Sequence, residues 1–144
     1  MQTFITSHDM VENAKNLDYK RLGKQRIEVI QILRVLLKLG PQGWKNHPIV
    51  KLWKGYESYL LNVYLKAILD EWKRRGYKNV KCEDHYMQIS KVLEGKKVEK
   101  PPWITDEFIT SHRSNLIRKD EKFYKPRFPG TPLNLPYIWS HKEG

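Results

Sequence analysis

The sequence predicts an all-α fold: a compact single domain with two long central helices, shorter flanking helices and an extended Pro-rich C-terminal tail. Apolar residues recur with a spacing near 3.6 along two long stretches, which is the period of an amphipathic helix. No stretch alternates apolar and polar residues as a half-buried strand would. The 144 residues are 40% hydrophobic, so we expect residues 1–144 to share one core as one domain.

The first long helix is expected to begin after Asp18, whose carboxylate can accept hydrogen bonds from the free amides of a first helical turn. Gly40 and Pro41 are expected to end it. Between these points the apolar residues keep a nearly helical spacing: Leu22, Val29, Ile30, Leu33, Leu36 and Leu37.

The second long helix is expected from Pro48 to Gly76. Proline suits the first position of a helix, where its missing N–H is not needed. Gly55 lies inside the stretch, at a place where the helix could kink. The wide apolar stripe that predicts this helix contains Leu52, Trp53, Tyr56, Tyr59, Leu60, Val63, Tyr64, Ala67, Ile68 and Trp72.

Shorter helices are expected in the second half of the chain. One covers about Glu83 to Leu93, and the Pro101-Pro102 pair closes that region. Thr105, followed by two acidic residues, is typical of a helix start, so one or two short helices should follow it. Past Tyr124, prolines at 126, 129, 132 and 136 favour an extended tail across the body, which carries Phe128, Tyr137 and Trp139.

The chain carries a formal net charge of +11, because 27 Lys and Arg residues outnumber 16 Asp and Glu residues. This excess indicates a polyanionic partner, and nucleic acid is expected ahead of an acidic membrane. No apolar run approaches the ~20 residues that span a bilayer, and the start of the chain lacks the apolar segment of a signal peptide. We therefore expect a soluble, cytoplasmic, DNA-associated monomer.

No metal site or cofactor is expected. Cys82 is the only cysteine, which excludes an internal disulfide and a zinc site built from paired cysteines. The five histidines stand at 8, 47, 85, 112 and 141, without the spacing of metal ligands. The sequence also lacks a GxSxG nucleophile motif and a GxxxxGK phosphate loop. Acid–base or amine chemistry on a nucleic acid is what remains.

Basic residues gather in three clusters. The first opens the first long helix, where free backbone amides favour an anion. Its phosphate-binding candidates are Lys20, Arg21, Lys24, Gln25 and Arg26. The second, Lys73 to Arg75, lies at a helix end, where cations complement the helix dipole, so a solvated structural role is favoured.

The third cluster, Ser111 to Lys119, is rich in the hydroxyl, amide, imidazole and guanidinium donors that suit phosphate oxygens. We refer to residues 20–26 as the first wall and to residues 111–119 as the second wall of an expected phosphate-binding groove. The candidates on the second wall are His112, Arg113, Ser114, Asn115, Arg118 and Lys119.

Aromatic residues near these clusters could stack on unpaired bases, at ~1–3 kcal/mol per stack. Tyr124 and Phe128 alternate with basic residues, and for them stacking and core packing are both open. Tyr124 and Lys125 are retained as DNA-binding candidates. For Trp44 and Trp139 the anchoring of a loop onto the core is favoured.

Glu28 is the carboxylate of most interest for catalysis, because it lies on a helix whose start is otherwise basic. Arg21 precedes it by seven residues, so the two share nearly the same helix face at ~10 Å. Lys24 lies between them, and an ordinary helical Lys–Glu pair contributing ~0.3 kcal/mol is the alternative. His47 suits either a helix cap or a phosphate contact.

A series of blocks follows along the chain: Met1-Gln2-Thr3-Phe4, Tyr19 to Arg26, Asn46-His47-Pro48, Tyr56 to Tyr77, Ser111 to Leu116 and Phe123-Tyr124-Lys125. In this order the blocks resemble the phage endonuclease V family of pyrimidine-dimer DNA glycosylases, and above all its small bacterial and viral members. The resemblance spans nearly the whole chain, and the ordered set is more specific than any one block.

The resemblance implies a compact all-helical fold and a repair glycosylase that extrudes a base from double-stranded DNA. It implies attack by the N-terminal α-amine on C1′ of the damaged nucleotide, giving a Schiff base that permits strand cleavage, with a helix glutamate assisting. An α-amine suits this role, because its ordinary pKa of ~7.7–8.0 leaves more neutral amine at pH 7 than the ~10.4 of lysine.

The catalytic residues that the resemblance implies are Met1, Glu28 and Arg21. Because Gln2 is bulky, retention of Met1 is expected, so Met1 would supply the amine. The family's glutamate follows an arginine in a Tyr-Arg-Glu-Leu pattern, and Arg21 stands in its place in Tyr19 to Leu22. Glu28, two turns further on, is the candidate substitute.

Three functions are compatible with the sequence. The first is a DNA-repair glycosylase for damaged or modified pyrimidines, with or without AP-lyase activity. The second is a non-catalytic nucleic-acid-binding module that keeps the basic groove. The third is an enzyme that acts on another phosphate-bearing substrate.

Overall fold

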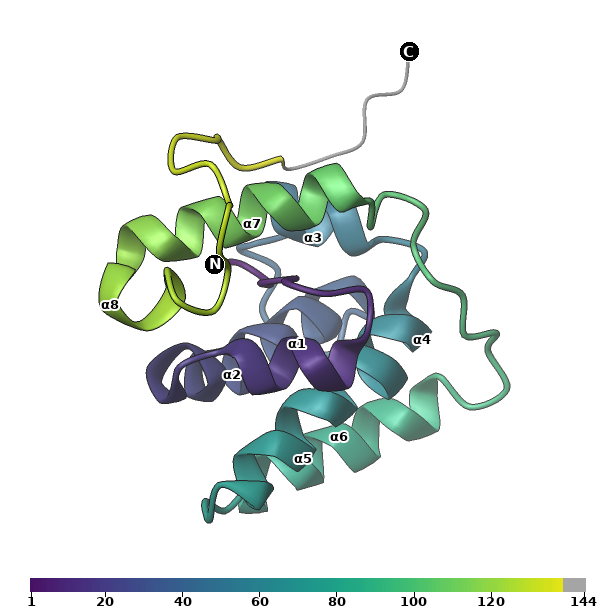
Figure 1. Cartoon of the computed structure of the whole chain (residues 1–144). Coiled ribbons are helices and arrows are strands. Elements are labelled where there is room, and N and C mark those ends of the chain that lie inside the picture. The colour runs from purple at the N-terminus through teal and green to yellow at the C-terminus, as the bar shows by residue number, and fades with distance from the viewer. Residues whose placement is uncertain (139–144) are drawn as a thin grey trace.

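The computed structural model describes residues 1–138, and within them it confirms the all-α fold, with helices and no strand (Figure 1). Trp139 and His141 lie outside the described residues. No described helix has the length and apolar character needed to cross a membrane. The elements are α1 (Met10–Asn16), α2 (Tyr19–Leu36), α3 (Pro48–Trp53), α4 (Glu57–Tyr59), the π-helix η1 (Leu60–Leu65), α5 (Lys66–Arg74), α6 (Val80–Val92), α7 (Asp106–Lys119) and α8 (Glu121–Tyr124).

The first long helix begins where the sequence predicts. The Asp18 side chain accepts a hydrogen bond from the Arg21 amide and caps α2. The helix ends at Leu36, four residues before Gly40, and Lys38 follows in the left-handed region with φ 57°. The buried face of α2 contains Leu22, Gln25, Val29, Ile30, Ile32, Leu33 and Val35.

The second long helix is divided, which corrects the expectation of one helix with a kink. Gly55 has φ +94°, a left-handed conformation that ends α3 instead of bending it. The Glu57 carboxylate accepts a hydrogen bond from the Gly55 amide, and the helix restarts there. From α4 through η1 to α5 the chain is continuously helical over Glu57–Arg74, and it ends beside Gly76 at φ +97°, as expected.

The second half contains α6 and α7. The helix expected over about Glu83 to Leu93 is α6, which begins slightly earlier at Val80. Thr105 caps α7 through a hydrogen bond from the Phe108 amide, and α7 is one continuous helix of 14 residues instead of short pieces. Beyond α8 the described tail is irregular and lies along α7, with Phe128 buried at its start.

The segment that positions the site is the N-terminal one, Met1 to Thr6, which belongs to no helix. Figure 1 shows it in purple, running through the middle of the molecule between α2 and α7. Gln2 to Thr6 are all buried. The start of the chain is therefore part of the core and not a loose end.

Candidate active site

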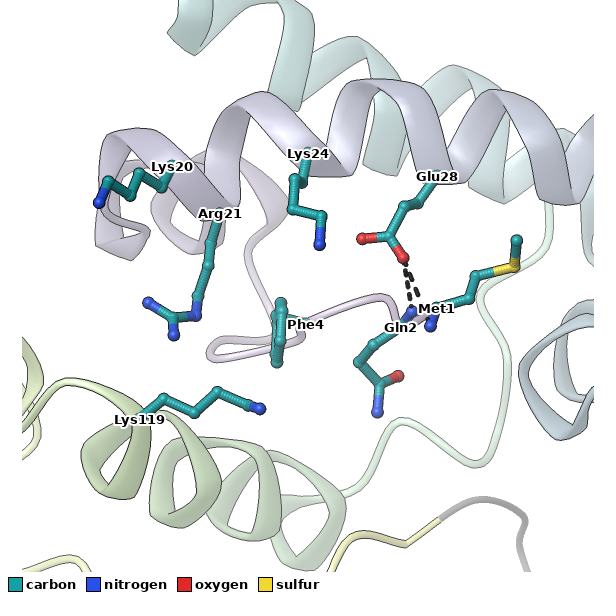
Figure 2. A pocket seen from close by; sticks show the side chains of 8 residues that line it. All are labelled: Met1, Gln2, Phe4, Lys20, Arg21, Lys24, Glu28 and Lys119. Carbon is teal, nitrogen blue, oxygen red and sulfur yellow. Dashed lines mark hydrogen bonds and ion pairs between the residues drawn. The ribbon is translucent and has the colours of Figure 1, made fainter.

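A cavity of about 380 Å³ opens beside the N-terminal segment. Figure 2 shows side chains of α2 and, from the opposite side, Lys119 of α7 directed into the same space, with Phe4 between them. The lining residues are Met1, Gln2, Phe4, Lys20, Arg21, Lys24, Glu28 and Lys119. Four of these are cationic side chains and one is a carboxylate, so the cavity suits an anion.

Residues of α2 line the cavity because they repeat at helical spacing. Lys20, Lys24 and Glu28 are each four residues apart, so they follow one face of the helix. Arg21 lies beside this face and donates to the Asp18 carboxylate at 3.2 Å. The first wall thus brings three of its expected residues, Lys20, Arg21 and Lys24, to the cavity.

The α-amine of Met1 and the carboxylate of Glu28 are close neighbours at this cavity. The Met1 nitrogen lies 3.7 Å from Glu28 Oε2, which also accepts the Gln2 amide at 3.1 Å (Figure 2). The Met1 side chain is only 3% exposed although the residue is half-buried, so its exposed part is the main chain with the amine. A carboxylate in this position can hold the ammonium form or accept its proton.

His47 caps α3, because its Nδ1 accepts the Ile49 amide at 3.0 Å. Burial lowers the pKa of His47, the nearby N-terminal ammonium lowers it further, and Glu28 opposes both. His47 therefore lies near the amine–carboxylate pair. Its helix-capping role is confirmed, and a phosphate contact remains a prediction. Trp44 packs edge-to-face on His47 and is half-exposed.

Gln25 and His112 are fully buried, which corrects their expected contact with phosphate. Gln25 Oε1 accepts the Phe4 amide at 3.0 Å, and His112 Nδ1 accepts the Ile5 amide at 3.1 Å. Burial lowers the pKa of His112 to about 3, so its ring is neutral at pH 7. Both side chains hold the N-terminal segment and do not face solvent.

Three of the six second-wall candidates, Ser114, Asn115 and Arg118, bind the protein's own tail instead of facing the cavity. Arg118 donates to Ser114 Oγ at 3.0 Å, to Asn115 Oδ1 at 2.6 Å and to two tail carbonyls. Asn115 also donates to the Leu135 carbonyl at 3.1 Å. The donors that predicted phosphate binding are thus occupied internally, and from this wall only Lys119 lines the cavity.

Arg113 differs from the expectation in a similar way. Its Nε donates to the Thr6 carbonyl at 2.8 Å, and its guanidinium lies over the Phe128 ring at 4.9 Å. Arg26, on the first wall, lies over the Trp72 ring at 4.2 Å and donates to Asn79. Both arginines support the packing between elements, and neither lines the cavity.

Tyr124 is fully buried, so of its two open roles the structure supports core packing. Its hydroxyl donates to Asp18 and accepts the Asp18 amide. Burial opposes ionisation of Asp18, but hydrogen bonds from Tyr124 and Arg21 outweigh it and hold the pKa of this carboxyl below its ordinary value. Lys125 is exposed and pairs with Glu121 at 3.6 Å, away from the cavity lining.

Two lining residues, Gln2 and Phe4, are not among the residues that the sequence predicts for the site. The sequence also does not predict Asn13 and Tyr64, which donate to the Phe4 carbonyl. They act across separations of 9 and 60 residues, and no local pattern marks such contacts. Within residues 1–138 no three His, Cys, Asp or Glu side chains gather to hold a metal ion.

Comparison with known families identifies the chain. A family profile described as pyrimidine dimer DNA glycosylase matches residues 1–84, which is more than half of the 144 residues. The chain therefore belongs to the pyrimidine dimer DNA glycosylase family. The matched range contains every cavity residue except Lys119. No curated protein and no solved structure matches the chain.

Proposed function

We propose that this protein removes pyrimidine dimers from duplex DNA with the Met1 α-amine as nucleophile and Glu28 as the proton-transfer group. The observation that carries the proposal is the 3.7 Å separation between the Met1 nitrogen and Glu28 Oε2 inside a cationic cavity. Membership of the glycosylase family supports the reaction class. The proposal requires Met1 to be the terminal residue of the working protein.

Base release would begin with proton transfer from the Met1 ammonium to Glu28. The neutral amine then bonds to C1′ of the damaged nucleotide as the bond from C1′ to the base breaks. Glu28 returns the proton to the departing base. The amine proton passes to the sugar ring oxygen as the ring opens, which leaves an iminium between Met1 and C1′. General acid–base help of this kind contributes ~10²–10⁴-fold to rate.

Strand cleavage would follow from the same iminium. Loss of a proton from C2′ to Glu28 drives elimination of the 3′ phosphate, so the C3′–O bond breaks, and water then hydrolyses the Schiff base. This step is the AP-lyase activity. One carboxylate next to one amine suffices for both steps, since Glu28 is a base again once it has given up its proton to the departing base.

DNA binding would use the cations around the cavity. Lys20, Arg21 and Lys24 on α2 and Lys119 on α7 face each other across it, so phosphates on either side of an extruded nucleotide could be neutralised. Phe4 offers an aromatic surface between them. We infer that the extruded nucleotide enters here, with its sugar toward Met1.

A test uses three duplexes of the same sequence: undamaged, containing one pyrimidine dimer, and containing one abasic site. We expect base release from the dimer duplex, cleavage of the abasic duplex and a borohydride-trapped adduct with both. An intact mass that includes Met1 is expected for the active protein. Salt-sensitive binding without any product would contradict the proposal and favour the non-catalytic binding module.

Two extended proteins distinguish an effect of the α-amine from an effect on folding. Two residues added before Met1 should abolish the adduct, because they remove the amine from its place beside Glu28. The same two residues added after Gly144 should leave all products unchanged. Base release without an adduct would overturn the lyase step and the amine mechanism together, while leaving a glycosylase that activates water.

A further inference from the structure

The N-terminal segment is held almost wholly by side chains. Five consecutive amides, from Gln2 to Thr6, each donate to a side-chain acceptor, and four of these acceptors come from α1, α2 and α7. The acceptors are Glu28, the Gln2 side chain itself, Gln25, His112 and Asn13. An irregular segment in a core has no ladder partners, so each of these bonds replaces one that a sheet would supply.

Gln25 contacts this segment in both directions. Its Oε1 accepts the Phe4 amide at 3.0 Å, and its Nε2 donates to the Gln2 carbonyl at 2.7 Å. The Tyr64 hydroxyl also contacts Oε1, and its single proton can be donated there or to the Phe4 carbonyl. The side chain is fully buried, so no water competes for these bonds. The backbone is thereby fixed on both sides of Thr3, close behind the residue that carries the α-amine.

Gln25 and Glu28 are three residues apart on α2 and therefore neighbours on one helix face. One turn of α2 thus carries both the carboxylate that contacts the amine and the carboxamide that fixes the backbone bearing it. We propose that Gln25 is a positioning residue, which sets the place of the Met1 α-amine beside Glu28. This inference rests on the proposed function for its effect on catalysis, while the positioning itself can be measured without DNA.

A nucleophile at a chain end depends on hydrogen bonds to the backbone behind it more than a side-chain nucleophile does, because the chain is tethered on one side only. The α-amine lies on Met1, at the free end of the backbone. A misplacement of the amine by about 1 Å can lower the rate about 100-fold. Met1 adds its own anchor, because its side chain is buried against the core. The carboxamide of Gln25 then fixes the remaining backbone freedom between that anchor and Phe4.

The first experiment measures the amine directly. Acylation of the Met1 α-amine by a small activated ester, followed by mass spectrometry, reports how accessible and how well paired the amine is. Gln25→Met keeps the length of the side chain and removes its hydrogen bonds, so we expect acylation at least about fivefold faster than in the wild type. Unchanged acylation in folded Gln25→Met would overturn the positioning role.

The second experiment measures catalysis. Single-turnover trapping by borohydride on the abasic duplex should be about 100-fold slower in Gln25→Met, with DNA affinity within twofold of the wild type. A positioning defect lowers the rate at every pH from 6 to 9 without moving the profile along the pH axis. A wild-type trapping rate in the folded variant, or a shifted profile of unchanged height, would contradict the inference.

Two further variants guard against a simple loss of folding. Gln25→Glu keeps an acceptor for the Phe4 amide and loses the donor to the Gln2 carbonyl. Its acylation should be faster than in the wild type by less than about fivefold, which can be measured even where Gln25→Met does not fold. Asn79→Asp makes the same chemical change at another buried carboxamide, which donates to the Leu69 carbonyl at 2.8 Å. We expect wild-type acylation and trapping in Asn79→Asp.

The outcomes also separate this inference from the proposed function. Absence of any adduct with the wild type would overturn the proposed function, and the acylation rates would still decide the role of Gln25. Equal acceleration of acylation by Asn79→Asp and Gln25→Met would show a general loosening of the core and overturn the specific role of Gln25.

Discussion

The two walls of basic and polar residues are alike in sequence and different in structure. Residues 20–26 and 111–119 each combine lysine, arginine and hydrogen-bond donors at helical spacing. In the first wall Lys20, Arg21 and Lys24 face the cavity, whereas in the second wall only Lys119 does. Composition alone therefore indicates which stretches carry donors and does not show which acceptors those donors find.

The cause of the difference is the tail. The described tail after α8 has no helix or strand, so its carbonyls need donors from elsewhere. Arg118 and Asn115 supply them for Leu133 and Leu135, and Ser111 does so for Pro136. On α2 the irregular N-terminal segment takes its hydrogen bonds from Gln25 and Glu28, whereas Lys20 and Lys24 line the cavity.

The largest effect is expected for Glu28→Gln, on α2 just beyond the first wall. The substitution keeps the size of the side chain and removes its ability to accept a proton, so we expect turnover on a dimer-containing duplex to fall by about 10²–10⁴-fold. DNA affinity should remain within a few-fold. Measurement of single-turnover rate and affinity on the same duplex checks this, and turnover equal to the wild type would reduce Glu28 to a structural role.

On the second wall the largest expected effect is a loss of folding stability at acidic pH, caused by His112. His112 is fully buried with its pKa lowered to about 3, whereas an unfolded histidine titrates near 6.5. Below pH 6.5 the unfolded chain therefore binds a proton that the folded chain does not, and stability falls as the pH falls. The slope is up to about 1.4 kcal/mol per pH unit, which gives a loss of about 2 kcal/mol between pH 7 and pH 5.

Urea unfolding at pH 7 and pH 5 measures this loss, with His112→Asn as the matched variant. Asparagine can still accept the Ile5 amide and does not titrate, so its stability should change much less over this range. Asp18 and Glu71 have lowered pKa values, and their own losses begin only as the pH falls below about 5, toward the ordinary values of 3.8 and 4.5. The same pH 7 to pH 5 loss in both proteins would contradict a buried neutral His112.

A charge-matched pair of variants tests the comparison itself. Lys24→Gln and Arg118→Gln each remove one positive charge, but Lys24 lines the cavity and Arg118 binds the tail. We expect Lys24→Gln to weaken duplex binding and to lower the salt dependence by about one counterion, with stability unchanged. Arg118→Gln should cost about 1 kcal/mol of stability, with duplex binding nearly unchanged. Equal effects on binding would mean that both walls contact DNA.

The smallest effect is expected for Lys119→Gln. Lys119 is exposed and is the only second-wall residue that lines the cavity. The variant should therefore show the same reduced salt dependence as Lys24→Gln, and its affinity for the duplex should fall by a few-fold or less. Titration of the abasic duplex at three salt concentrations provides the measurement. A salt dependence identical to the wild type would remove α7 from the DNA-binding surface.

The sequence predicts the helices well because their signals are local. The cap at Asp18 and the stop at Gly76 both lie within a few residues of the structure they determine. The sequence predicts a weak point at Gly55, but the positive φ of Gly55 and the π-helix that follows depend on packing that periodicity does not encode. The break at Gly55 could therefore be located in advance, while its geometry could not.

The candidate site is predicted less completely, because it depends on partners far apart in the sequence. Met1, Arg21 and Glu28 line one cavity, since Arg21 and Glu28 lie on the first long helix and the N-terminal segment packs against it. His112 reaches the N-terminal segment across 107 residues, and its burial reverses its expected role. Residue type predicted its capacity for hydrogen bonding, and only the fold determines that its partner is the Ile5 amide.

The central claim is that the nucleophile is the α-amine of Met1, and three lysine amines in the same cavity, Lys20, Lys24 and Lys119, are its competitors. Borohydride trapping on an abasic duplex, nuclease digestion and peptide mass spectrometry locate the sugar remnant on one nitrogen. The remnant is expected on the α-amine of the peptide that begins at Met1. A remnant on any lysine side chain, with Met1 unmodified, would contradict the account.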